Sequence, residues 1–263
     1  MENIKAVSKR KKASRLNKVS IPAEIIMNII IAIFSLICII PFVFVIIITF
    51  TSQESLREIG YSFRPISLSL TAYRYVVNLG ELILRAYGNS IFITVVGTIL
   101  SVLICVLYSY ALFRPDYKWR GFFNFLSFFN PFNIIIMRTF FKTSVPTELI
   151  EAAAIDGSGE YNTLFRIITP IAKPGIATIA LMNAIAIWNE WYIPMLYIRE
   201  SKLYPLQYVL IRMQNDIDFL VKNASSLGVE AQRIAANLPK DSLRMVLVVL
   251  VVLPIACAYP FFQ

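Results

Sequence analysis

The chain of 263 residues contains no histidine, which excludes histidine-based acid–base catalysis and any metal site with a histidine ligand. It also lacks a G-x-x-x-x-G-K-[ST] phosphate-binding loop, so ATP, if it is used, must be bound by another chain. Its three cysteines, Cys38, Cys105 and Cys257, each lie inside an apolar stretch and form no C-x-x-C pair, as expected for packed or lipid-facing side chains. We therefore expect neither a metal nor a cofactor on this chain.

Charged residues are scarce as well. They make up 16% of the chain, hydrophobic residues make up 57%, and the mean hydropathy is +0.66. A soluble domain carries about 25% charged residues. The segment Ile25–Phe50 has no charge, and its roughly 26 residues can cross a hydrocarbon core of about 30 Å. It is too long for the apolar core of a signal peptide, which has about 7–15 residues. These features predict an all-α membrane protein that crosses the bilayer several times.

The net charge of +9 is concentrated before the first apolar segment. Seven basic residues precede it, against two acids, Glu2 and Glu24: Lys5, Lys9, Arg10, Lys11, Lys12, Arg15 and Lys18. A basic tail that abuts a membrane helix follows the positive-inside rule and can bind anionic lipid. Residues 1–24 are therefore predicted to be a cytoplasmic tail that binds no nucleic acid, and residues 25–263 to be the transmembrane domain.

The apolar stretches predict five spans. They are Ile25–Phe50, with a kink at Pro41, then Tyr87–Phe113, the short Phe122–Met137, Gly175–Ile198 and Met245–Phe262. Segment 114–121 carries three basic residues in a short loop, which indicates the cytoplasmic side. Segment 51–86, with short strand-like pieces, and segment 199–241 are then expected on the outside.

The third stretch creates a conflict of topology. One crossing by Phe122–Met137 would place segment 138–173 outside, although its basic residues near the membrane favour the inside. As a helix, Phe122–Met137 would be about 24 Å long, which is too short for two crossings. We therefore predict that roughly 25–40 residues are missing near Phe129–Asn130, enough for the rest of one span, a loop and the start of the next.

The polar segment 146–173 predicts two helices joined by a turn. "PTELIEAAAID" has a proline near its start, early acids and three alanines, which favour a helix. Asp156-Gly157 is a helix-stop pair, and Ser158 is a candidate cap for a second helix that Thr169-Pro170 would close. On composition alone, an ordinary cytoplasmic loop is the alternative.

The spacing in this segment matches a known pattern. Glu151-Ala152-Ala153, three residues, Gly157, nine residues, Ile167, two residues and Pro170 resembles the EAA motif of ABC import permeases, with Thr169 in the usual leucine position. "NSIFITVVGTILSVLICVLYSYALFR", "NPFNIIIMRTFFKTSVPTELIEAA" and "WNEWYIP" are similar to carbohydrate permeases of the maltose-permease-G type. Members of this family have six spans, one more than the five visible here.

The resemblance implies a multi-pass subunit in a bacterial cytoplasmic membrane with a cytoplasmic N-terminus. Its expected partners are a second homologous permease, two ATPase subunits that bind ATP and Mg, and an extracytoplasmic binding protein that delivers an oligosaccharide. The residues expected to couple to the ATPase are Glu151, Ala152, Ala153, Asp156 and Gly157. Another solute and a non-conducting membrane anchor remain as alternatives.

The span Gly175–Ile198 holds the candidates for a substrate path. They are Asn183, Trp188, Asn189, Glu190, Trp191 and Tyr192. A carboxylate inside a membrane is a functional candidate by default, and aromatic faces suit sugar rings. An interfacial aromatic belt with a structural Glu190 is the alternative, as is proton coupling through Glu190.

Overall fold

The computed structural model describes residues 21–114, 117–126 and 131–258. In these ranges the chain is helical, and its only β pairing is one antiparallel bridge between Thr51 and Leu68. The predicted all-α class is confirmed. Segment 51–86 contains two short helices, and the expected strand-like piece between them forms bends and the single bridge at Leu68.

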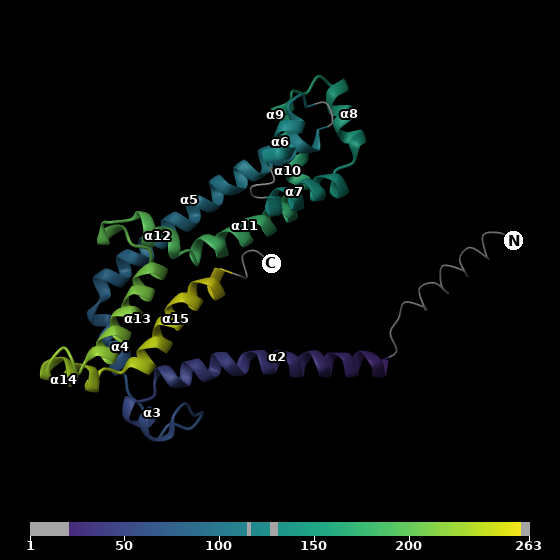
Figure 1. The fold of residues 1–263 in the computed structure, drawn as a ribbon. Helices are drawn as coiled ribbons and strands as arrows, with labels where there is room; N and C mark the ends of the chain where they lie inside the picture. Colours follow the sequence, from purple (N-terminus) through teal and green to yellow (C-terminus); the bar gives the residue numbers. More distant parts are fainter. Residues whose placement is uncertain (1–20, 115–116, 127–130, 259–263) are drawn as a thin grey trace. The chain divides into compact units, whose positions relative to one another are not determined.

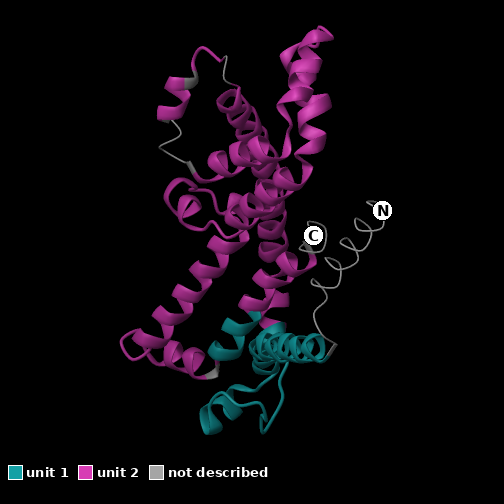
Figure 2. Ribbon diagram, turned by 90° about the vertical axis from the view of Figure 1, so that its right-hand side faces the viewer, with its two compact units in different colours: residues 1–73, 239–246 teal, residues 74–238, 247–263 magenta. Residues whose placement is uncertain are grey.

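The described chain divides into two compact units (Figure 2). One contains residues 1–73 and 239–246, and the other residues 74–238 and 247–263. The elements in chain order are α2 (Ile21–Thr49), α3 (Gln53–Ile59), α4 (Thr71–Asn78), α5 (Gly80–Phe113), α6 (Arg120–Leu126), α7 (Pro131–Ser144), α8 (Thr147–Ile155), α9 (Glu160–Asn162), the π-helical η2 (Thr163–Ile168), α10 (Thr169–Ile171), α11 (Lys173–Trp188), α12 (Tyr192–Tyr197), η3 (Ser201–Leu203), α13 (Leu206–Asn223), α14 (Val229–Asn237) and α15 (Lys240–Ala258) (Figure 1).

The first unit is built on α2, which continues through Pro41. Most of its apolar side chains are exposed around the whole helix, as in a helix that meets lipid or another subunit. The residues after it are tied to the start of α15: Asp241 accepts hydrogen bonds from Gln53 Nε2 at 3.0 Å and from the Tyr61 hydroxyl at 3.1 Å. Ser242 Oγ donates to the carbonyl of Thr51 at 2.6 Å.

The second unit is organised around α5, which packs against α7 and α11 (Figure 1). Small residues allow close approach. A Cβ at Gly175 in α11 would lie 2.7 Å from Cγ of Phe140 in α7, so only glycine fits there without a shift. A Cβ at Gly97 in α5 would lie 3.0 Å from Cδ1 of Ile187 in α11.

Two described helices are long and apolar enough to cross a membrane, Pro22–Thr49 and Gly80–Phe113. They correspond to the first two predicted spans. The segments Glu160–Ile171 and Lys173–Trp188 meet at a bend of 82°. Together they would form a third span, if the pair is counted as one broken span. The predicted last span corresponds to α15, whose described part ends at Ala258.

The predicted span Gly175–Ile198 is not one helix. Helix α11 ends at Trp188, and α12 begins at Tyr192. Pro194 has no N–H for the carbonyl of Glu190, so a continuous helix would lose a hydrogen bond at this point. Glu190 consequently lies between the two helices, whereas Asn183 and Trp188 lie in α11 and Tyr192 lies in α12.

The short apolar stretch Phe122–Met137 is also divided. Helix α6 ends at Leu126, and α7 begins at Pro131. The 14 residues of α7 cover about 21 Å, less than a bilayer core of about 30 Å. The predicted missing segment at Phe129–Asn130 lies outside the described residues.

Candidate functional site

The EAA pattern occupies α8 and the turn that follows it. Gly157 has a positive φ of 73°, which suits glycine, and the helix ends there as predicted. The N–H of Gly157 bonds to the carbonyl of Ala154 at 3.1 Å, and the N–H of Ser158 bonds to the carbonyl of Ala153 at 2.8 Å. These two bonds form a Schellman motif, which satisfies the last carbonyls of α8.

Helix α8 presents two different faces. Glu151, Ala152 and Asp156 are exposed, together with Gly157. Ala153 is only 5% exposed and packs within its own chain. The coupling residues expected from the sequence therefore divide into an exposed group, available to a partner, and one alanine that anchors the helix.

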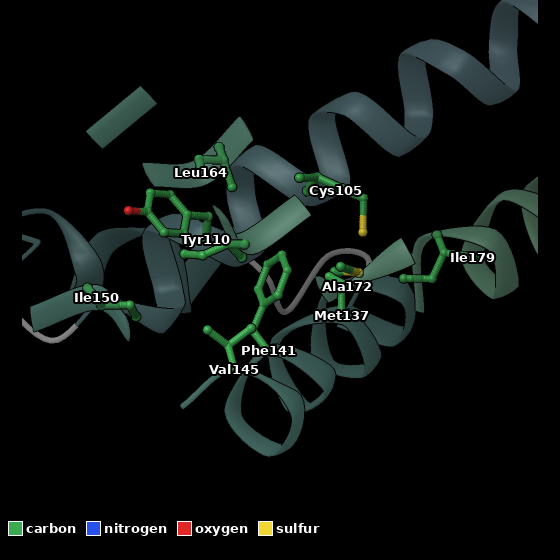
Figure 3. Close-up of a cluster of buried hydrophobic side chains, with 11 residues drawn as sticks. Cys105, Tyr110, Met137, Phe141, Val145, Ile150, Leu164, Ala172 and Ile179 are labelled. Atoms are coloured by element: carbon green, nitrogen blue, oxygen red, sulfur yellow. The ribbon is translucent and has the colours of Figure 1, made fainter. Parts of the chain in front are cut away.

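The inner face of α8 belongs to a core shared by several helices (Figure 3). Ile150 of α8 lies in a buried cluster with residues of α5, α7, η2 and α11. The cluster contains Cys105, Val106, Tyr110, Met137, Phe141, Val145, Ile150, Leu164, Ile168, Ala172 and Ile179. The EAA segment is thus packed onto the ends of three long helices and differs from a loose cytoplasmic loop.

The second predicted helix differs in two ways. Ser158 does not cap it; Gly159 occupies that position, and Ser158 Oγ instead accepts hydrogen bonds from Asn162 Nδ2 at 2.8 Å and Thr163 Oγ1 at 3.2 Å. The helix also continues past Thr169-Pro170 to Ile171, by way of the π-helical turn η2. Pro170 lacks an N–H for an ordinary helical bond, and a π turn is one way to accommodate that loss.

Glu160 connects this segment to α5. Its Oε2 accepts a hydrogen bond from the Tyr110 hydroxyl at 2.5 Å, and its Oε1 accepts one from Arg114 Nη2 at 2.6 Å. The EAA segment therefore lies at the same end of α5 as the basic loop 114–121. This is the placement expected from the charges, and it requires an even number of crossings between the two.

The opposite end of α5 meets the polar region after α12. Asn89 Nδ2 donates to the carbonyl of Lys202 at 2.8 Å, and Ser90 Oγ accepts the backbone N–H of Leu206 at 2.7 Å. Residues 89 and 114 are separated by about 37 Å along a straight helix. The EAA segment and the 199–206 region thus lie at opposite ends of a helix long enough to cross a bilayer.

The candidate path residues separate into packed and exposed side chains. Trp188 is 7% exposed, and its Nε1 donates to the carbonyl of Val251 at 3.2 Å. Asn189 bonds to the carbonyl of Ile185 and accepts from Gln207 Nε2 at 3.2 Å. Trp191 and Tyr192 are exposed and stand edge to face. Of the aromatic side chains proposed to contact sugar, the last two are accessible.

Glu190 has a local structural role. It is exposed, and its Oε1 accepts the backbone N–H groups of Tyr192 at 2.8 Å and Ile193 at 3.0 Å. A carboxylate in this position satisfies the free N–H groups at the start of α12. The structural interpretation of Glu190 is therefore the better one.

A pair of asparagines lies between α7 and α11. Asn133 Nδ2 donates to Asn183 Oδ1 at 3.0 Å. The buried Nδ2 of Asn183 has no partner among the described residues. Sequence analysis identified Asn183 but missed both Asn133 and Glu160, because each makes its contact with a residue about fifty positions away.

The comparisons agree with this arrangement, although a scan against protein-family models finds no match. Protein LplC of Bacillus subtilis (strain 168) is 32% identical over 260 residues, covering 86% of this chain and 85% of LplC. The polygalacturonan/rhamnogalacturonan transport system permease protein YtcP of the same organism is 29% identical over 263 residues, covering 88% of this chain and 90% of YtcP. A crystal structure of a bacterial ABC transporter involved in the import of the acidic polysaccharide alginate superposes with a TM-score of 0.70 and 26% identity. The superposition covers 91% of this chain and 95% of that chain.

The chain belongs to the family of permease subunits of sugar ABC importers. It is thus a membrane transport subunit of a machine that also includes an ATPase and a solute-binding protein. The predicted family, fold and general function are confirmed.

Proposed function

We propose that this subunit pairs with a second homologous permease and docks onto an ATPase subunit through α8. The observation that carries the proposal is the two-faced packing of this helix. Glu151 and Ala152 are exposed, whereas Ile150 and Ala153 are fixed in the core of the second unit. A partner that moves the exposed face also moves the helices to which the buried face is attached.

The exposed face of α8 suits a docking contact. The small side chain of Ala152 lets a partner surface approach the helix closely, and Glu151 offers a carboxylate to a basic side chain. Closure of two ATPase subunits around ATP and Mg would draw the docked helices together. The membrane helices would then tilt between inward-facing and outward-facing states. This subunit itself would make and break no covalent bond.

The orientation follows from charge. The end of α5 that holds Arg114 adjoins the basic 114–121 loop, so we place this end and α8 in the cytoplasm, together with the N-terminus. Asn89 and Tyr204 then lie at the extracytoplasmic end, where the binding protein would release its ligand. The host membrane would be the cytoplasmic membrane of a bacterium.

The substrate we propose is an oligosaccharide. YtcP is a polygalacturonan/rhamnogalacturonan permease, and the superposed structure imports alginate, which is also acidic. These two relatives favour an acidic oligosaccharide over a neutral one. Competition between a uronate oligomer and a neutral oligomer of equal length would separate the two classes.

The other transport mechanism is not favoured. Proton coupling needs an ionisable group that is free to exchange protons along the path, whereas Glu190 is occupied as a helix cap. A non-conducting anchor would not need α8 to be tied to the core of the bundle.

Reconstitution tests the proposal. The complex of both permeases, the ATPase and the binding protein is placed in vesicles, and uptake of labelled oligosaccharide and ATP hydrolysis are measured together. We expect Glu151→Lys and Gly157→Pro to lower uptake per ATP while the complex still assembles. Glu58→Lys, which reverses an exposed acid on α3, is the control. Normal uptake in both α8 variants, or uptake that stops when only the proton gradient is collapsed, would refute the proposal.

A further inference from the structure

We propose that Glu160 transmits movement of the EAA segment to α5 through its hydrogen bonds to Tyr110 and Arg114. These three residues form what we call the joint. This inference rests on the proposed function, because it presumes that α8 is moved by an ATPase. Nothing in the EAA pattern itself assigns a role to Glu160, which follows the Gly157 turn by three residues.

The contact is made at two points. The Tyr110 hydroxyl donates to one carboxylate oxygen, and Arg114 Nη2 donates to the other. Tyr110 and Arg114 are four residues apart, so they lie one above the other on the same side of α5. Two donors that hold both oxygens fix the direction of the Glu160 side chain as well as its distance from α5.

Both hydrogen bonds have a carboxylate as acceptor, and the bond from Arg114 also pairs opposite charges. Hydrogen bonds to a charged group are stronger than those between neutral groups. The side chain of Arg114 is 20% exposed and that of Glu160 60%, so solvent reaches mainly the carboxylate. Tyr110 is 8% exposed and anchors the contact in the buried cluster.

The joint adds something that the apolar core cannot supply. Ile150, Leu164 and Ile168 hold the segment against α5 and α7 by burial, which is non-directional and leaves its angle and its position along α5 loosely fixed. Hydrogen bonds to a carboxylate are directional and resist sliding. The core would therefore keep the EAA segment in contact with α5, and Glu160 would make α5 follow its direction of movement.

An open cavity lies on one side of the joint. The cavity has a volume of about 350 Å³, and its lining includes Leu107, Ala111, Tyr117 and Tyr161 as well as the three joint residues. The carboxylate therefore borders open space, while Leu164 and Ile168 remain packed with Tyr110 in the buried cluster. Its loss should affect coupling more than the assembly of the fold.

A charge exchange tests the joint in the reconstituted complex. Glu160→Ala and Arg114→Glu each remove the ion pair, and the double variant Arg114→Glu with Glu160→Arg restores it in reverse. We expect each single variant to lower uptake per ATP about tenfold, within the usual range for coupling between sites. The double variant should recover a substantial part of it. Glu81→Ala breaks another α5 ion pair, that with Arg85 within the same helix, and should leave the ratio unchanged.

A crosslink to the ATPase and the assembly of the complex distinguish failure of the joint from failure of the docking proposal. A cysteine crosslink from Ala152→Cys to the ATPase should form equally in the native and Glu160→Ala complexes. If it forms and Glu160→Ala transports normally, the joint is refuted while the docking proposal stands. If Glu160→Ala fails to assemble, Glu160 serves the fold, and if the exchange gives no recovery, the ion pair is not what transmits movement; either result refutes the joint. If the crosslink is absent from the native complex, the proposed function itself is wrong.

Discussion

The carboxylate of Glu190 accepts the backbone N–H of Tyr192 at 2.8 Å, across the break between α11 and α12. This contact predicts how the residue responds to substitution. Glu190→Gln keeps a side-chain oxygen that can accept the same bond, so uptake should stay close to the native rate. Glu190→Ala leaves the first N–H groups of α12 without their acceptor and should cost about 1 kcal/mol of stability. Thermal unfolding and uptake of both variants check this. A Glu190→Gln protein that is as stable as the native protein but does not transport would point to proton transfer instead.

Gly157 and Gly159 provide a matched pair of substitutions. Neither has an atom within 4 Å of an added Cβ, but Gly157 has a φ of 73° and Gly159 a φ of −69°. Gly157→Ala should therefore be strained by about 1–2 kcal/mol through its backbone alone, and Gly159→Ala should not. We expect a lower unfolding midpoint and lower uptake per ATP only for Gly157→Ala. Equal behaviour of the two variants would contradict the observed end of α8.

Gly175 tests the packing of α11 against α7. Gly175→Ala places a methyl group 2.7 Å from the ring of Phe140, and overpacking of this kind costs about 1–3 kcal/mol. Gly88→Ala in α5 meets open space and is the control. A lower unfolding midpoint for Gly175→Ala, partly recovered by Phe140→Leu, is the expected result. A Gly175→Ala protein as stable as the control would show that the two helices are farther apart.

Trp188 should affect stability rather than substrate recognition. Trp188→Phe removes the hydrogen bond to Val251, a loss of about 1 kcal/mol. Its unfolding midpoint should fall while the apparent KM for uptake stays the same. Trp191→Phe, at a side chain 38% exposed, is the comparison. A changed KM with unchanged stability in Trp188→Phe would show that Trp188 takes part in substrate recognition.

Local chemistry explains which features were predictable. The end of α8 at Gly157 follows from glycine's freedom at positive φ, and the first two spans follow from length and composition alone. The break after Trp188 was missed because apolar residues continue on both sides of Asn189-Glu190. Only the combination of Pro194 with a side chain able to cap α12 ends the helix there.

The missed site residues depend on distant partners. Nothing in the sequence distinguishes Glu160 from other surface acids. Its ion pair becomes visible only in the fold, which places Arg114, 46 positions earlier, beside it. Ser158 resembled a helix cap, but its hydroxyl instead bonds to Asn162 and Thr163. Composition and periodicity carry little information on such pairings, because they depend on the packing of α5 against the EAA segment.

Crosslinking from α8 tests the central claim most directly. Ala152→Cys and, as a control, Ser225→Cys are introduced after Cys38 and Cys257, which are exposed, have been replaced by alanine. Each cysteine is given a thiol-attached photocrosslinker in membranes that contain the whole complex. The account predicts a covalent product with the ATPase from position 152 and none from position 225. It also predicts that a membrane-impermeant maleimide added to intact cells labels only position 225. Labelling of position 152 from outside, or no ATPase product from it, would contradict the account.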